Sequence, residues 1–210
     1  MQLNEGLRIF IRDIKPTDHI VLFYDNAEAK RSIVYNYLAE GLEKGRGIVY
    51  VCGEETPKDV REGLASLGVD VEPNERSENI LIKTYEGWYL ENNTVDSLKI
   101  INKWNDTAKK FSERGLGTRV SGEVSKFFQE GRVRELLRYE YALHKVMTIP
   151  METLCSYDLN SIVQTGYTDM IMPIVRAHGK AIFASKGGNV IIEPEIIEDT
   201  DVEKLLEIKV

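Results

Sequence analysis

The sequence has few of the features that mark several common classes of protein. It contains only two cysteines, Cys52 and Cys155, which do not have Cys-x-x-Cys spacing, so no disulfide framework is expected. The formal net charge of −7 leaves no excess of lysine and arginine for binding nucleic acid. No apolar run approaches the ~20 residues that span a bilayer, and the first residues lack the order of a secretion signal. We therefore expect a cytoplasmic protein with no direct nucleic-acid or membrane partner.

The sequence also lacks the glycine-rich loop with which many nucleotide-binding proteins hold phosphate. The apolar segment His19–Tyr24 leads into the residues YDNAEAKRS (24–32), which include no glycine. A phosphate-binding loop needs several glycines, so that backbone N–H groups converge on the anion, followed by Lys-Ser or Lys-Thr. The single Gly-Lys pair, Gly179-Lys180, is followed by Ala181 instead. We therefore expect no ATP cofactor.

Segments with strand and helix character alternate through most of the chain. Six apolar segments predict strands: His19–Tyr24, Ile48–Cys52, Ile80–Thr84, Thr118–Ser121, Thr153–Tyr157 and Lys180–Ala184. Segments with an apolar period near 3.6 residues predict helices between them, among them Thr94–Glu113, Val133–Val146 and Asp169–Ala177. This alternation predicts an α/β fold, with a mostly parallel sheet and helices on both of its faces. We see no linker, so residues 1–210 are expected to form one domain.

The two ends of the chain depart from this alternation. Residues Leu7–Ile11 predict a short edge strand that leads into the sheet. Near the other end, Lys180–Ser185 and Asn189–Glu193 flank a Lys-Gly-Gly turn and predict an antiparallel hairpin. The last dozen residues are expected to form a short helix or a tail.

Ligands of open parallel sheets bind beyond the carboxyl ends of the strands. The residues expected at those ends are Tyr24, Asp25, Glu54, Glu55, Tyr85, Glu123, Tyr157 and Asp158. This set contains no basic residue, so it would repel phosphate and suit a cation, an amine or a neutral organic molecule. Structural explanations remain open for several members. The tyrosines could be core aromatics, the glutamates at 54 and 55 could favour the start of the next helix, and Asp158 could be a helix N-cap.

A metal site is a further possibility that the sequence leaves open. His19, Cys155 and His178 could meet with Glu123 or Asp158, but no pair of them has a ligand spacing such as His-x-x-x-His. A cysteine inside a strand is most often an inert small hydrophobe. His178 could simply be a favourable cation at the end of a helix. The sequence therefore predicts no particular metal.

Five short motifs, in order along the chain, resemble one known family. They are His19-Ile20-x-x-Phe23-Tyr24, Leu42–Gly45 leading to Tyr50-Val51, Gly122–Ser125, Arg138–Glu140 and Cys155-x-Tyr157-Asp158. Together they resemble the MEDS family, the methanogen/methylotroph DcmR-type sensory domains, over residues from about 17 to about 184, with a hairpin and tail at 185–210. The family is regarded as a RecA-superfamily derivative, so the resemblance implies a RecA/KaiC-like fold without the phosphate loop.

The resemblance also implies a function and a set of site residues. It implies sensing of a small molecule, with hydrocarbon derivatives as the proposed class. The ligand-binding residues that it implies are His19, Tyr24, Glu123, Cys155, Tyr157, Asp158 and His178. Analysis of the strand ends adds Glu54 to this set.

Three functions therefore compete. The first is a non-catalytic sensory domain that binds a small organic ligand at the carboxyl ends of the strands. The second is a residual KaiC-like nucleotide-binding protein or ATPase, because Glu54-Glu55 resembles the acidic turn that supplies the catalytic base of such enzymes. The third is a scaffold with a vestigial pocket. No helix-turn-helix or kinase segment is recognisable, so a sensor would act through a separate transcription regulator or kinase, or through a homo-oligomer.

Overall fold

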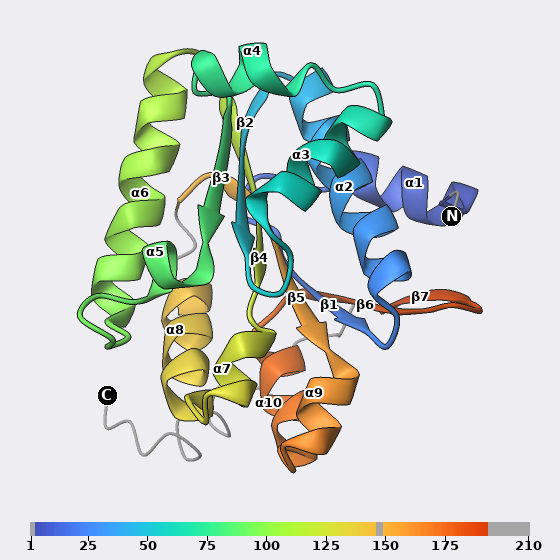
Figure 1. The fold of residues 1–210 in the computed structure, drawn as a ribbon, viewed down its shortest axis with the longest axis vertical. Helices are drawn as coiled ribbons and strands as arrows, with labels where there is room; N and C mark the ends of the chain where they lie inside the picture. The colour runs from blue at the N-terminus through green and yellow to red at the C-terminus, as the bar shows by residue number, and fades with distance from the viewer. Residues whose placement is uncertain (1–2, 146–148, 193–210) are drawn as a thin grey trace.

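The protein is built around one mixed sheet. The computed structural model describes residues 3–145 and 149–192. Within them the sheet has seven strands in the order β3-β2-β4-β5-β1-β6-β7 (Figure 1). The strands are β1 (His19–Tyr24), β2 (Arg46–Cys52), β3 (Ile80–Thr84), β4 (Gly117–Glu123), β5 (Met151–Asp158), β6 (Lys180–Ser185) and β7 (Gly188–Ile192). All neighbours pair in parallel except β6 and β7, which confirms the predicted parallel sheet and C-terminal hairpin.

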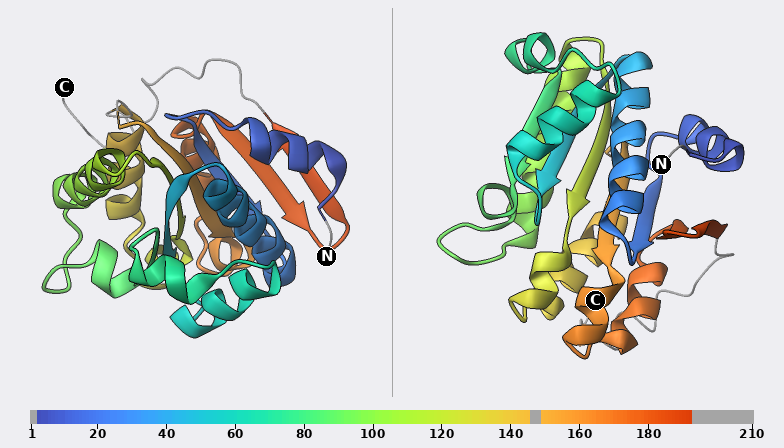
Figure 2. Two further views of the ribbon diagram at one scale, coloured as in Figure 1. Left: turned by 90° about the horizontal axis from the view of Figure 1, so that it is seen from above. Right: turned by 45° about the vertical axis from the view of Figure 1, so that its right-hand side comes forward.

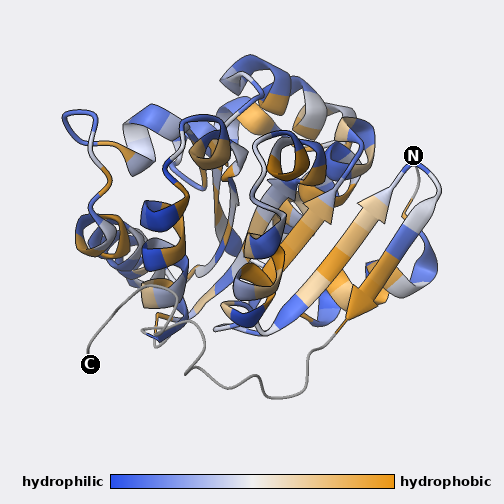
Figure 3. Ribbon diagram, turned by 90° about the horizontal axis from the view of Figure 1, so that it is seen from below, coloured by the Kyte–Doolittle hydropathy of each residue, from blue (hydrophilic) through white to orange (hydrophobic). Residues whose placement is uncertain are grey.

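Helices cover both faces of the sheet (Figure 2). They are α1 (Glu5–Asp13), α2 (Ala27–Glu43), α3 (Pro57–Ser66), α4 (Val71–Arg76), α5 (Tyr85–Tyr89), α6 (Ser97–Glu113), α7 (Ser125–Gln129), α8 (Val133–Lys145), α9 (Leu159–Gln164), the 3₁₀ helix η1 (Thr168–Met170) and α10 (Ile171–Arg176). Their outer surfaces are largely hydrophilic and the strands between them are apolar (Figure 3). Among the helices of the described residues, none combines the length and apolar character needed to cross a bilayer.

Side chains that alternate along each strand divide the core into two parts. In β1, Val21 and Phe23 pack with α6, α8 and α10. Ile20, Leu22 and Tyr24 pack on the opposite face with α1, α2 and α3. This period of two follows from the pleat of a strand. Because of this alternation, only predicted site residues on the same face of the sheet can contact one another.

The prediction of an edge strand at Leu7–Ile11 is wrong, because these residues lie in α1. Five apolar-rich residues fit either period, and the helix is decided by their surroundings. Leu7 and Ile11 are the buried residues of α1, one helical turn apart, and the side chain of Asn4 caps the helix by accepting the N–H of Leu7. The outer edge on this side of the sheet is formed by β7 instead.

Other predicted boundaries shift by a few residues. The helix predicted from Thr94 begins at Ser97 after the N-cap Asp96. The helix predicted at Asp169–Ala177 is divided into η1 and α10. Residues 146 and 193, which end a predicted helix and a predicted strand, lie outside the described residues, as does the predicted tail.

Candidate functional site

The eight predicted site residues fall into two separate groups. Tyr24, Glu54, Glu123 and Asp158 lie at the carboxyl edge of the sheet, whereas His19, Cys155, Tyr157 and His178 are buried in its interior. The register explains the division, since β1 and β5 pair with Val21 opposite Cys155 and Phe23 opposite Tyr157. Tyr24 is one residue further along and points to the other face. A single pocket lined by all eight side chains is therefore not what the fold produces.

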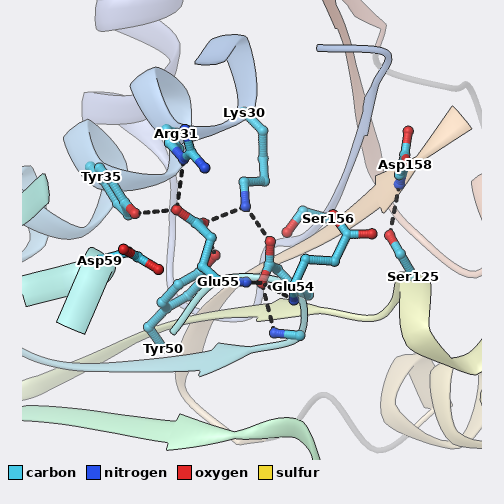
Figure 4. A network of polar contacts seen from close by, with 12 residues as sticks. Lys30, Arg31, Tyr35, Tyr50, Glu54, Glu55, Asp59, Ser125, Ser156 and Asp158 are labelled. Carbon is cyan, nitrogen blue, oxygen red and sulfur yellow. Dashed lines mark hydrogen bonds and ion pairs between the residues drawn. The ribbon is translucent and has the colours of Figure 1, made fainter. Parts of the chain in front are cut away.

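A buried ion-pair network occupies the carboxyl edge (Figure 4). The ammonium group of Lys30, which α2 carries, pairs with the carboxylates of both Glu55 and Glu123. The Oε2 atom of Glu123 also accepts the backbone N–H groups of Gly53 at 2.6 Å and Glu54 at 3.0 Å. The network therefore joins α2, the turn after β2 and the end of β4.

Glu55 is bound by side chains of two elements, α2 and β2, in this network. Besides Lys30, it accepts the Nε–H of Arg31 at 2.8 Å and the hydroxyls of Tyr35 and Tyr50, the latter at 3.1 Å. Burial acts to raise the pKa of Glu55, but Lys30 and the hydroxyl and guanidinium donors outweigh it and hold the pKa below its usual value. The charged carboxylate is thus the form that the fold stabilises.

The expectation that this edge is purely acidic is wrong. An inventory of strand ends misses side chains that reach the same edge from a helix, as Lys30 and Arg31 do. The start of α2 is also closed, because the side chain of Asn26 accepts the N–H of Ala29 at 2.9 Å. With its lysine paired and its helix N-terminus capped, this edge does not present a ready anion site.

The remaining predicted residues at this edge have local roles. Asp158 is the N-cap of α9 and accepts the N–H of Asn160 at 2.9 Å, in agreement with its structural explanation. Glu54 accepts a hydrogen bond from Gln129 at 3.0 Å. Burial, followed by the charges of Glu123 and Asp158, raises the pKa of Glu54. The acidic turn thus has one carboxylate inside the network and one beside it.

The second group forms a compact cluster of metal-ligating side chains with a residue that was not predicted, Glu140 of α8. One donor atom from each of His19, Glu140, Cys155 and His178 lies within 4.8 Å of all the others. His19 Nε2 is 3.5 Å from Cys155 Sγ and 3.2 Å from Glu140 Oε2. Glu140 Oε2 is 3.7 Å from Cys155 Sγ and 3.6 Å from His178 Nε2. The three predicted residues do meet, but neither Glu123 nor Asp158 supplies the carboxylate.

Two members of this cluster, Glu140 and His178, are each held by a defined contact. Tyr157 donates its hydroxyl to Glu140 Oε1 at 2.7 Å, which leaves Oε2 facing the other donors. His178 Nδ1 lies 2.7 Å from the carbonyl oxygen of Ile174, so this nitrogen carries the proton and Nε2 has a free lone pair. Nε2 makes no hydrogen bond to any residue that the structure describes. Buried polar atoms are rarely left without a hydrogen-bond partner, so this nitrogen is a candidate for binding a ligand or an ion.

Burial dominates the electrostatics of the cluster. It lowers the pKa of His19 to about 3 and, with His19 as the next cause, that of His178 to about 3. It raises the pKa of Glu140, and together with Glu140 it raises the pKa of the Cys155 thiol well above its usual range. The explanation of His178 as a helix-end cation is therefore wrong, because the residue is only 2% exposed and its charged form is disfavoured.

A pocket of about 380 Å³ is lined in part by α8, the helix that also carries Glu140. It lies between α8 and the segment that follows β5, and its lining residues are Gly131, Val133, Arg134, Glu135, Leu137, Tyr167 and Met170. Leu137 and Glu140 are three residues apart on α8 and share a helical face. The ring of Phe128 lies 6.1 Å from that of Tyr167 in the pocket and 6.2 Å from that of Tyr157 in the cluster. The ring of Phe128 therefore connects Tyr167 of the pocket lining to Tyr157, which holds Glu140.

The sequence contained signals for the residues that were missed. Glu140 stands in the apolar stripe of α8 with Leu136, Leu137 and Leu143, where a lone carboxylate is unusual. Lys30 likewise stands in the buried stripe of α2 with Ile33 and Val34, where a lone charged residue is equally unusual. A charged residue within an apolar helical stripe is the sequence pattern that identifies Glu140 and Lys30 as candidates.

The strand order, the helices on both faces and the closed phosphate edge define an α/β domain of the RecA/KaiC-like class. A solved KaiC-like protein from the hyperthermophilic archaeon Pyrococcus horikoshii OT3 is similar to the chain with a TM-score of 0.60 and 16% identity, over 87% of this chain and 81% of that one. At this identity the likeness shows the fold alone. No curated protein matches the chain.

Within that class, the sequence belongs to one family. Residues 18–178 match the family model of MEDS, the MEthanogen/methylotroph, DcmR Sensory domain. The match covers most of the chain, so this protein is a member of the MEDS family, and the resemblance drawn from its short motifs is confirmed. A sensory role follows from that membership.

Proposed function

We propose that the chain is a non-catalytic sensor that binds a small, weakly polar organic molecule in the pocket between α8 and η1. The observation that carries the proposal is the position of this pocket. It is formed by the segments that follow β4 and β5, beyond the carboxyl ends of the strands, where open parallel sheets bind ligands. One of its walls is α8, which also carries Glu140 of the buried cluster, and the chain belongs to a sensory family.

The dimensions and lining of the pocket favour a small ligand. Its volume is at the lower end of the range of about 300–1,000 Å³ that is usual for ligand pockets. Val133, Leu137, Tyr167 and Met170 contribute apolar surface to the lining, and Arg134 and Glu135 contribute one charge of each sign. An alcohol, an aldehyde or a halogenated hydrocarbon fits this lining better than a phosphate ester. Hydrocarbon derivatives are accordingly the class of ligand that we favour.

Sensing requires the ligand to bind one conformation of the protein better than another. The pocket joins α8 to η1, two elements that the chain connects through β5 and α9. A molecule held between them would favour one spacing of α8 relative to the sheet. The response would then pass to a separate transcription regulator or kinase, or to a second copy of the chain.

Calorimetric titration of the purified chain with small alcohols, aldehydes, halogenated hydrocarbons and amines tests this proposal. The pocket variant is Met170→Trp, which places an indole in the cavity, and its matched control is Met172→Trp, because Met172 is 55% exposed and does not line the pocket. We expect binding to weaken at least about 10-fold in Met170→Trp, which corresponds to a loss of about 1.4 kcal/mol, and to be unchanged in Met172→Trp.

Two results would contradict the proposal. One is the absence of binding across the whole panel by the folded wild-type chain, which would favour a scaffold with a vestigial pocket. The other is a ligand that binds equally well to both methionine variants, which would place the binding site elsewhere in the molecule.

A further inference from the structure

We propose that His19, Glu140, Cys155 and His178 bind a transition-metal ion of the zinc class. This proposal goes beyond the organic ligand and does not depend on it. Four pairs of donor atoms are separated by 3.2, 3.5, 3.6 and 3.7 Å. Tetrahedral zinc, with Zn–N near 2.0–2.1 Å and Zn–S near 2.3 Å, places its ligand atoms about 3.3–3.6 Å apart. Four of the six donor separations are thus close to those of a tetrahedral site, and all six lie within 4.8 Å.

The contacts around the donors are those expected of a metal site. Metal-ligating histidines commonly donate their second ring nitrogen to a carbonyl oxygen, and ligating carboxylates are themselves hydrogen-bonded. His178 follows the first pattern through the carbonyl of Ile174, and Glu140 follows the second through the hydroxyl of Tyr157. Both contacts direct the remaining donor atom toward the centre of the cluster. An ion there would also give His178 Nε2 the partner that it lacks among the described residues.

The chemistry of the donors selects the class of ion. One thiolate and one carboxylate together balance the charge of a divalent ion, and the two imidazoles bind as neutral ligands. A site with no net charge suits an interior in which the four side chains are at most 3% exposed. Sulfur and imidazole nitrogen favour zinc and its transition-metal neighbours, whereas magnesium and calcium prefer oxygen.

The four donors come from four different parts of the chain. His19 begins β1, Cys155 lies within β5, Glu140 is on α8, and His178 follows α10. An ion at their centre would tie α8 and the end of α10 to the sheet. It would therefore fix the helix that forms one wall of the small-molecule pocket.

The test is metal analysis of the purified full-length chain, together with titration of the metal-free protein with Co²⁺. We expect about one zinc-class ion per chain and a thiolate-to-cobalt charge-transfer band on titration. Cys155→Ser should remove the band and weaken Co²⁺ binding at least 100-fold. Cys52→Ser is the matched control, because Cys52 is also buried and free but lies on the opposite face of the sheet. It should bind Co²⁺ as the wild type does.

A milder variant covers the case in which Cys155→Ser does not fold. Tyr157→Phe removes only the hydroxyl that holds Glu140, and outer contacts of this kind are worth about 10–100-fold in metal affinity. The proposal is overturned if the folded wild type binds neither zinc nor Co²⁺, or if Cys155→Ser and Cys52→Ser bind Co²⁺ equally. Because this readout uses no organic ligand, its failure leaves the small-molecule proposal standing, and silence in the organic panel leaves the metal proposal standing.

Discussion

Two buried polar clusters lie in the same sheet and differ in how completely their groups are paired. At the carboxyl edge, Glu55 and Glu123 share the ammonium group of Lys30 and accept further N–H and O–H donors. In the interior cluster, four groups able to bind a metal face one another, and His178 Nε2 has no hydrogen-bond partner among the described residues. The charged groups of the first cluster are therefore all paired without a ligand, whereas the donor set of the second cluster is not.

This difference separates structural polar groups from functional ones. A buried charge that is fully paired contributes to a unique fold and requires nothing from outside the chain. A buried donor set that lacks partners carries a desolvation cost, which a bound species can offset. At the sheet edge where a phosphate loop would hold its anion, the charged groups are thus already paired. Under α8, the buried donor groups still lack a partner.

The largest expected effect is that of removing the cation from the complete cluster. Lys30→Met should lower the free energy of unfolding by about 3–5 kcal/mol, because two buried carboxylates lose their shared counter-charge. Urea denaturation followed by circular dichroism measures the change. Arg31→Met is the control: this side chain is 50% exposed and also pairs with Glu55, so its loss should cost no more than about 1 kcal/mol. Equal losses in the two variants would show that the buried pairing does not stabilise the fold.

The pH dependence of Glu55→Gln should show the same pairing. At pH 7 the variant should be less stable than the wild type by about 1–3 kcal/mol, because several charge-assisted hydrogen bonds are weakened. The folded protein holds the pKa of Glu55 below its usual value of 4.5, so this carboxylate contributes stability above pH 4.5 that is lost as the pH falls through the folded pKa. The difference in unfolding free energy between wild type and variant should therefore be constant from pH 7 to about 5 and shrink below 4.5. A difference that grew on acidification would contradict this assignment.

A pair of tyrosine variants compares the two clusters directly, in metal-free protein. Among the described residues Tyr157 alone donates a hydrogen bond to Glu140 Oε1, whereas Tyr35 is one of several donors to Glu55. Tyr157→Phe should therefore cost about 1–3 kcal/mol, the penalty for leaving a buried acceptor unsatisfied. Tyr35→Phe should cost about 0.5–1 kcal/mol, because the other donors remain. Denaturation curves of the two variants that coincided would remove the distinction between the clusters.

The fold could be predicted from the sequence because local patterns determine it. The apolar strands and 3.6-period helices alternate, and this alternation leads to a parallel sheet with helices on both faces. The missing phosphate loop was likewise visible as missing glycines. The error at α1 arose because a short apolar run fits both periods, and the burial of Leu7 and Ile11 with the Asn4 cap decides for the helix.

The sites could be predicted only in part, because tertiary structure assembles them. Strand ends identified Glu123, but its partner Lys30 comes from a helix that returns along the sheet. His19 and Cys155 meet because β1 pairs with β5, an adjacency that the order of the chain does not show. Ligands that come from four separate elements leave no spacing motif in the sequence. For that reason the sequence suggests Glu123 or Asp158 as the carboxylate of the cluster, whereas the structure has Glu140 there.

The smallest expected effect is that of Mg-ATP on thermal stability. An unchanged Tm would show that the carboxyl edge does not bind nucleotide. A nucleotide present at 100 times its dissociation constant adds about 2.7 kcal/mol of stability, which for a chain of this length raises Tm by roughly 5–10 °C. We expect no rise at millimolar Mg-ATP beyond that produced by Mg²⁺ alone. Lys30 is already paired with two carboxylates, and Asn26 already caps α2, so a phosphate would have to break buried contacts in order to bind. A saturable rise in Tm that disappears in Lys30→Met would mean that Lys30 leaves its carboxylate partners to bind nucleotide. The carboxyl edge would then be the ligand-binding site.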